Sequence, residues 1–142
     1  MDDAERLFAW RNDPLTRANA RNSDPIEYPA HLAWLAATLK NPALRLLVIE
    51  SNREPAATAR FDYDDPTEFS FCIAPSFRGK ALSLKLMRTA IEAEPDHISH
   101  VLKHNTPCQR LLAACGARLL QDGPVQTWRY EAQAWSAGAA AA

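Results

Sequence analysis

The chain has 142 residues, of which 47% are apolar and 23% are charged, and its formal net charge is −1. A chain of this length is expected to form one domain that buries about two-thirds of its unfolded surface in a single core. Because its charge is nearly balanced, we expect neither nucleic acid nor a membrane surface as its main partner.

The termini and the cysteines indicate a cytoplasmic protein. The first residues are acidic and lack an apolar segment, and no stretch approaches the roughly eighteen apolar residues of a membrane span. Cys72, Cys108 and Cys115 form an odd set without a C-x-x-C pair, which is typical of reduced thiols. We predict one domain over residues 1–134 and a flexible alanine-rich tail over 135–142.

Two helices are predicted near the start of the chain. Apolar residues follow a helical spacing from Asp3 to Arg11, and the Asn-Asp-Pro run at 12–14 ends the pattern. The same spacing resumes after Pro29 and continues to the Asn-Pro pair at 41–42. The residues between the two helices are expected to form a polar connection.

Three antiparallel strands are predicted next. The run 44–50 is rich in Leu, Val and Ile, and 56–63 resumes a looser alternation after the turn formers Ser51 and Asn52, which indicates a hairpin. After the Asp-Asp-Pro turn at 64–66, the residues from Glu68 to Ile73 alternate polar and apolar with a period of two.

The second half of the chain alternates helices and strands. Thr106 and Pro107 are expected at the cap and at the first position of the second of these helices. The predicted elements are a helix over 82–93, a strand over 97–103, a helix over 106–114, and strands over 117–121 and 125–133. The order ααβββαβαββ implies one parallel crossover, so the fold class is α+β or mixed α/β, with a mixed sheet flanked by helices.

The turn before the helix at 82–93 carries positive charge. Arg78 and Lys80 are basic, and Gly79 allows the backbone to come close to a ligand. A helix start leaves N–H groups unpaired and carries the positive end of the helix dipole, so a phosphate there would gain several donors. The turn indicates an anion site, and a solvated basic loop that caps the helix is the alternative.

This turn resembles the Q/R-x-x-G-x-G/A turn with which the GNAT superfamily of acyl-CoA-dependent N-acetyltransferases binds the CoA pyrophosphate. Ala81 replaces the central glycine of that motif and Ser83 its last small residue, and both can be accommodated because backbone N–H groups hold the pyrophosphate. The segment from Asn105 to Gly116 is similar to the family's second signature. The resemblance implies a GNAT-like fold and acetyl-CoA as cosubstrate.

The resemblance also implies which residues hold CoA. The implied cofactor-binding residues are Ile73, Ala74, Arg78, Gly79, Lys80, Ala81, Leu82, Ser83 and Asn105. A backbone N–H around 72–74 would stabilise the oxyanion, because two strands splay apart there in the family. Asn105 would bond the pantetheine arm or a substrate, or act instead as a turn or cap residue.

Family members usually begin with a strand that precedes the first helix, and this chain begins at the helix. Either the sheet is one strand short, the start has been trimmed, or another element fills that edge. An unfilled edge would leave room for a homodimer.

Acetyl transfer to an amine requires a neutral amine, an oxyanion donor and a proton for the departing thiolate. The resemblance implies Glu68 as the base, directly or through water, and a solvent-facing strand glutamate is the alternative. Many family members use a tyrosine on the fourth helix as the general acid, and this chain has Leu112 at the corresponding position. Cys108 is the candidate acid, because the pKa of a thiol falls near a helix start. A packing role is the alternative for Cys108. In that case His104 or water could serve as the acid.

Residues of the first two helices and of the strand after the hairpin are candidates for the wall of the substrate pocket, although the tryptophans could equally anchor helices to the sheet. These predicted substrate-binding residues are Trp10, Arg11, Asn12, His31, Trp34 and Arg60. No metal site is expected, because His97, His100 and His104 have no acidic or cysteine ligand at a suitable spacing.

The segments 7–14 and 31–34 resemble a GNAT subgroup that acetylates amino sugars on nucleotides. The prediction is an enzyme that moves an acetyl group from acetyl-CoA to a primary amine of a small molecule, such as an amino sugar or nucleotide sugar, by direct attack. Two alternatives stay open: a non-catalytic CoA-binding or regulatory module, and a protein N-terminal or lysine acetyltransferase.

Overall fold

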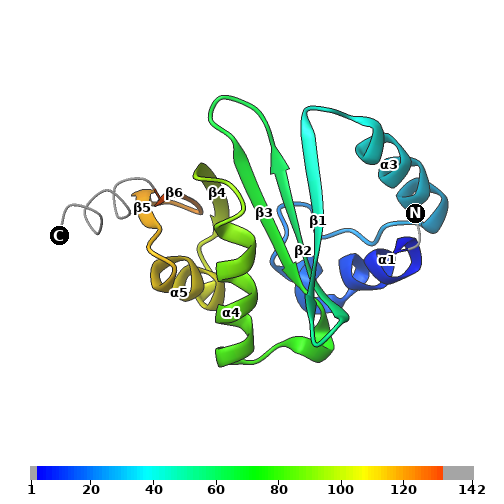
Figure 1. The fold of residues 1–142 in the computed structure, drawn as a ribbon, viewed down its shortest axis with the longest axis horizontal. Coiled ribbons are helices and arrows are strands. Elements are labelled where there is room, and N and C mark those ends of the chain that lie inside the picture. Colours follow the sequence, from blue (N-terminus) through cyan, green and yellow to red (C-terminus); the bar gives the residue numbers. More distant parts are fainter. Residues whose placement is uncertain (1–2, 133–142) are drawn as a thin grey trace.

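Six strands form one mixed sheet in the computed structural model, which describes residues 3–132 (Figure 1). The elements are α1 (Ala4–Asn12), α2 (Pro14–Ala18), α3 (Tyr28–Lys40), β1 (Leu44–Ser51), β2 (Glu54–Asp62), β3 (Glu68–Ile73), the 3-10 helix η1 (Pro75–Phe77), α4 (Lys80–Ile91), β4 (Asp96–Leu102), α5 (Thr106–Ala114), β5 (Arg118–Gln121) and β6 (Val125–Glu131). The predicted tail over 135–142 lies outside the described residues. Within residues 3–132, no helix is both long and apolar enough to cross a membrane.

The strand order across the sheet is β1-β2-β3-β4-β6-β5. β1, β2 and β3 form the predicted antiparallel meander, β3 pairs with β4 in parallel, and β6 is antiparallel to both β4 and β5. The predicted mixed sheet with one parallel crossover is therefore confirmed. No strand precedes α1 in the part of the chain that the structure describes, so β1 and β5 are the two edges of the sheet.

The parallel strands β3 and β4 separate soon after they meet. Their ladder contains one residue pair, Glu68 with Ile98, and the Ile98 N–H donates to the Thr67 carbonyl at 2.8 Å. The opposite edge of β3 pairs with β2 along the whole strand. Beyond Glu68, the edge of β3 that faces β4 therefore borders a gap, which is the splay that the family resemblance implied.

The main hydrophobic core lies between one face of the sheet and helices α4 and α5. Alternate residues of β2 and β3 point into it, and Phe61 and Phe69 pack ring against ring with centroids 5.1 Å apart. His97 is buried among these rings, where its Nε2–H donates to the Ile91 carbonyl at 2.9 Å. Burial lowers the pKa of His97, which favours the neutral ring in the core.

The other face of the sheet is covered by α1 and α3 (Figure 1). Ala4, Leu7 and Leu35 form a second, smaller core there, and Leu46 of β1 packs against it. His31 is buried in α3 and its Nε2–H donates to the Ala4 carbonyl at 2.9 Å, which joins the two helices.

Three local predictions were wrong. Residues 14–18 form the helix α2 rather than a polar connection, because the Asp13 carboxylate caps it by accepting from the Thr16 N–H at 3.2 Å. Helix α4 begins at Lys80 instead of Leu82. Asn105, not Thr106, caps α5 by accepting from the Cys108 N–H at 3.4 Å.

Candidate active site

A cavity of about 330 Å³ lies between the sheet and helices α1 and α3. Its wall is formed by Leu7, Trp10, Arg11, Ile26, His31, Trp34, Leu46, Thr58, Arg60 and Cys72. Five of the six predicted substrate-binding residues line this cavity. The sixth, Asn12, does not line it but binds the backbone of Ile26, which does. Its side-chain amide donates to the Ile26 carbonyl and accepts from the Ile26 N–H, both at 2.8 Å, which fixes the loop that carries Ile26.

The polar groups of the cavity wall are mainly cationic. The Arg60 guanidinium forms an ion pair with Asp62, with Nε and Oδ1 2.6 Å apart, and lies 5.7 Å from the centroid of the Trp34 ring. Arg11 donates from Nη2 to the Asn22 carbonyl at 3.0 Å, and its Nη1 is buried without a partner among residues 3–132. No aspartate or glutamate is among the residues that line the cavity.

Some N–H groups of the turn before α4 are already hydrogen-bonded within the turn and the first turn of the helix. The Gly79 N–H donates to the Ser83 hydroxyl at 3.2 Å, and the Ser83 N–H donates to the Gly79 carbonyl at 2.7 Å. The N–H groups of Ala81 and Leu82 lie in the first turn of the helix, where no intrahelical partner is available. These two groups, with the positive end of the helix dipole, fit a phosphate, whereas those of Gly79 and Ser83 are already engaged.

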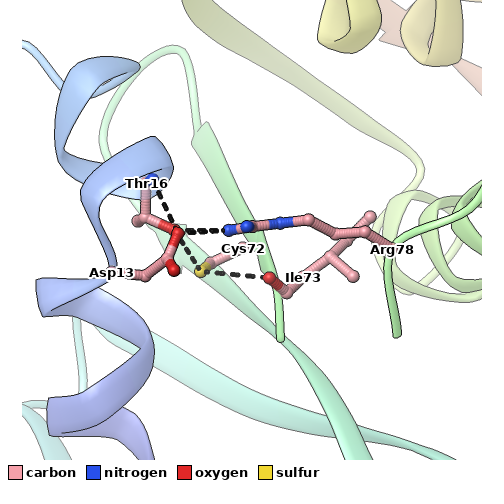
Figure 2. A network of polar contacts seen from close by, with 5 residues as sticks. All are labelled: Asp13, Thr16, Cys72, Ile73 and Arg78. Atoms are coloured by element: carbon pink, nitrogen blue, oxygen red, sulfur yellow. Dashed lines mark hydrogen bonds and ion pairs between the residues drawn. The ribbon is translucent and has the colours of Figure 1, made fainter. Parts of the chain in front are cut away.

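Arg78 points away from this turn, toward α2 (Figure 2). Its Nη2 lies 2.7 Å from the Asp13 carboxylate and 3.0 Å from the Thr16 hydroxyl. The hydrogen bond from Arg78 holds the pKa of Asp13 below its usual value. In this conformation the Asp13 carboxylate, at the start of α2, therefore occupies the Arg78 guanidinium, which would have to leave it to meet a pyrophosphate.

The backbone at the end of β3 offers one donor to the gap. The Ala74 N–H donates to the Ala56 carbonyl at 2.8 Å, so it faces β2 and is not available to the gap. Successive residues of a strand direct their N–H groups to opposite edges. The Ile73 N–H is therefore directed toward β4, on the side where the two strands have separated.

Glu68 lies at the closed end of the gap, at the start of β3. Its carboxylate forms an ion pair with Arg21 at 3.1 Å, and its side chain shares the cavity-side face of the sheet with Ser70 and Cys72. Glu68 is not among the residues that line the cavity. A proton would have to reach it through water.

The candidates for a general acid are poorly placed. Cys108 packs against the main core, where burial raises the pKa of its thiol to about 11, so the predicted lowering of that pKa by the helix start is wrong. Leu112 is buried in the same core. The Nε2–H of His104 donates to the Ala18 carbonyl at 3.1 Å.

Helix α2 and the residues that follow it make contacts along the gap. The sequence did not indicate these contacts. The contacts beyond Arg78 are Thr16 Oγ1 with Cys72 Sγ at 3.9 Å, Ala18 with His104, and Arg21 with Glu68. Burial raises the pKa of the Cys72 thiol, which therefore stays protonated at the cavity wall. The Asn-Asp-Pro run at 12–14 was the one available signal, because it both ends α1 and begins α2.

Comparison with known proteins agrees with this geometry. The model of the Acetyltransferase (GNAT) family matches residues 4–117, and the chain belongs to this family of acetyl-CoA-dependent N-acetyltransferases. A search of curated proteins gave no match.

Solved structures share the fold at low sequence identity. The chain is similar to yncA from Salmonella typhimurium, solved with its cofactor acetyl-CoA, with a TM-score of 0.74, 19% identity, and 92% of this chain and 89% of that chain covered. It is also similar to spermidine N-acetyltransferase from Vibrio cholerae in complex with CoA and spermine, with a TM-score of 0.78, 16% identity, and 90% of this chain and 89% of that chain covered.

Within residues 3–132, no group of three His, Cys, Asp or Glu side chains is placed to hold a metal ion.

Replacing Gly79 with alanine tests whether the turn approaches CoA. A Cβ at Gly79 meets no atom within 4 Å and the backbone is extended, so the free energy of unfolding should change by no more than about 0.5 kcal/mol. If a phosphate lies against this backbone, the Kd for acetyl-CoA measured by calorimetry should rise roughly tenfold.

Gly116 provides the matched control, because its φ of +93° disfavours a side chain and it follows α5. Gly116→Ala should lower stability by about 1 kcal/mol and leave the Kd unchanged. An unchanged Kd in Gly79→Ala would exclude close contact between this turn and the ligand.

Replacing Asp13 with asparagine tests whether α2 competes with CoA for Arg78. Asparagine caps a helix as well as aspartate does, so α2 should persist while the ion pair is lost. If Arg78 must leave Asp13 to bind the pyrophosphate, the Kd for CoA should fall by up to about fivefold, the value of a solvent-exposed ion pair. A higher Kd in Asp13→Asn would mean that the ion pair itself holds the site in its binding geometry.

Proposed function

We propose that the chain transfers the acetyl group of acetyl-CoA to a primary amine of a small molecule bound in the cavity. One observation carries this proposal. Cys72 lines the cavity, and the N–H of the next residue, Ile73, is directed into the gap between β3 and β4. A thioester in the gap and an amine in the cavity would therefore meet at the end of β3.

The proposed reaction is a direct attack. The amine nitrogen bonds to the thioester carbon, the oxygen becomes an oxyanion, and the carbon–sulfur bond then breaks to release CoA as a thiolate. The Ile73 N–H would stabilise the oxyanion, and Glu68 would accept the amine proton through water. Because the Cys108 thiol has a pKa of about 11 and packs against the core, we assign protonation of the thiolate to water instead.

CoA would lie along the gap with its pyrophosphate at the start of α4. The proposed binding residues are Ile73, Arg78, Gly79, Lys80, Ala81, Leu82, Ser83 and Asn105. The Ala81 and Leu82 N–H groups are the proposed phosphate donors, and Arg78 joins them once it leaves Asp13. The Asn105 Oδ1 caps α5, which leaves its amide N–H groups for the pantetheine arm.

Trp10, Arg11, His31, Trp34 and Arg60 are the proposed acceptor-binding residues, and the acceptor is the amine that receives the acetyl group. An amino sugar or nucleotide sugar, predicted from the sequence alone, stays one candidate acceptor. A protein N-terminus or lysine is another, although a cavity of about 330 Å³ fits a small molecule better than a peptide.

The test is a thiol-release assay with acetyl-CoA and separate panels of amino acids, amino sugars, polyamines and peptides. We expect release that depends on the amine and an acetylated amine in equal amount by mass spectrometry. Thermal stabilisation by CoA without turnover on any panel would favour the non-catalytic CoA-binding module. Absence of both would contradict the proposal.

We also propose that two copies of the chain associate through a sheet edge and that the protein is cytoplasmic. Leu119 and Leu120 on the edge strand β5 are exposed, as is Val125 at the start of β6. The three cysteines Cys72, Cys108 and Cys115 are free thiols, in keeping with a reducing compartment. Sedimentation velocity should give twice the mass of the chain, and a monomer at micromolar concentration would contradict the dimer.

A further inference from the structure

The arginines around the cavity differ in how they are neutralised. Arg60 is paired with the Asp62 carboxylate and Arg78 with the Asp13 carboxylate. Arg11 contacts only a neutral carbonyl, that of Asn22, and its Nη1 is buried without a partner among the described residues. The wall that carries Arg11 therefore has an uncompensated positive charge.

A cation that no carboxylate neutralises is a place where an anionic ligand gains a charge-assisted hydrogen bond. The two oxygens of a carboxylate match the fork of a guanidinium, as those of a phosphate do. Arg11 and Cys72 line the same cavity, so Arg11 lies near the end of β3 where the amine is expected.

The rest of the cavity indicates what the anion is attached to. Leu7, Ile26 and Leu46 are apolar, and Trp10 and Trp34 are aromatic surfaces. The volume of about 330 Å³ suits a molecule of amino-acid size and leaves little room for a nucleotide sugar. A polyamine would require carboxylates, and no residue that lines this cavity supplies one.

We infer that the acceptor is an amine that also carries an anionic group, namely an α-amino acid with an apolar side chain, whose carboxylate binds the Arg11 guanidinium. This inference rests on the proposed acetyl transfer and names the substrate class for that same cavity. The Vibrio cholerae relative binds spermine. The charge of this cavity selects for the opposite kind of amine.

The test compares matched pairs of amines in the thiol-release assay. L-Phenylalanine, L-methionine and L-leucine are each paired with their amides, which keep the amine and side chain but lack the negative charge. We expect kcat/KM for the acid to exceed that for the amide by roughly tenfold to a hundredfold, the range for a hydrogen bond to a charged group. Spermidine should be a poorer acceptor than any of the acids.

The variant Arg11→Gln identifies the residue responsible. Glutamine keeps an N–H donor and part of the length of the side chain but removes the charge and the fork, so the acid-to-amide ratio should fall to about one. Since the ratio is taken within one protein sample, partial unfolding of the variant does not change it. Arg6→Gln is the control on the same helix, because Arg6 pairs with Asp3 and does not line the cavity, and its ratio should match the wild type.

The outcomes separate this inference from the proposed function. Turnover of spermidine above the acids, or equal rates for acids and amides, would overturn the carboxylate site while acetyl transfer stands. A preference for glucosamine 6-phosphate over both glucosamine and the amino acids would replace the carboxylate by a phosphate and overturn the amino-acid assignment. No release from any amine would overturn the proposed function and this inference together.

Discussion

Replacing Glu68 with glutamine is expected to lower kcat for amine acetylation by roughly a hundredfold or more, the usual contribution of a general base. Glutamine has nearly the same shape but cannot accept the amine proton. The fold should be unaffected, because the ion pair that is lost joins Glu68 to Arg21, whose side chain is 61% exposed. The KM for acetyl-CoA should change little, since Glu68 lies at the closed end of the gap.

The matched control for this variant is Glu54→Gln. Glu54 is an exposed carboxylate at the start of β2, away from both the cavity and the gap. Steady-state kinetics with a saturating amine should show wild-type kcat for Glu54→Gln. If Glu68→Gln also retained wild-type kcat, Glu68 would be a strand glutamate on the protein surface and the base would have to be sought elsewhere.

Replacing Phe61 with alanine is expected to lower the free energy of unfolding by about 3–5 kcal/mol. The Phe61 side chain is 0% exposed and its ring packs against Phe69 and His97, with centroids 5.1 and 5.2 Å away. The loss would be a large part of the roughly 5–15 kcal/mol that stabilises a domain of this kind. Urea unfolding, monitored by circular dichroism, measures the difference.

The control is Leu39→Ala, because Leu39 is 52% exposed on α3 and its truncation should change stability by less than about 1 kcal/mol. Equal effects of the two substitutions would show that the face of the sheet under α4 is not the main core.

The order of the long elements could be predicted because hydrophobic periodicity determines them. β3 is a clear example, since the alternation from Glu68 to Ile73 has the bounds of the observed strand. Helix α2 could not be predicted in the same way, because five residues are too few to show a helical period. It depends on one capping contact from Asp13, and the run that contains Asp13 reads equally well as the end of α1.

The site was predictable where it depends on a helix face or a strand face. Trp10 and Arg11 from α1, His31 and Trp34 from α3, and Arg60 from β2 all line the observed cavity. Contacts between residues far apart in the chain could not be predicted from the sequence. Nothing local to Arg78 indicates that it binds a carboxylate 65 residues earlier in the chain.

Burial was a second limit on the sequence-based predictions. The position of Cys108 in the first turn of α5 favours a low pKa, but the surrounding core has the opposite and larger effect. A capping role for Asn105 and a ligand role could not be separated from sequence, because the same amide can serve in both.

A crystal structure of the protein with bound CoA tests the central claim most directly. The claim is that the gap between β3 and β4 holds the pantetheine arm and that the start of α4 holds the pyrophosphate. The account predicts phosphate oxygens within hydrogen-bond distance of the Ala81 and Leu82 N–H groups, and the CoA sulfur near the Ile73 N–H at the edge of the cavity. CoA bound at any other surface, with the gap closed, would contradict it.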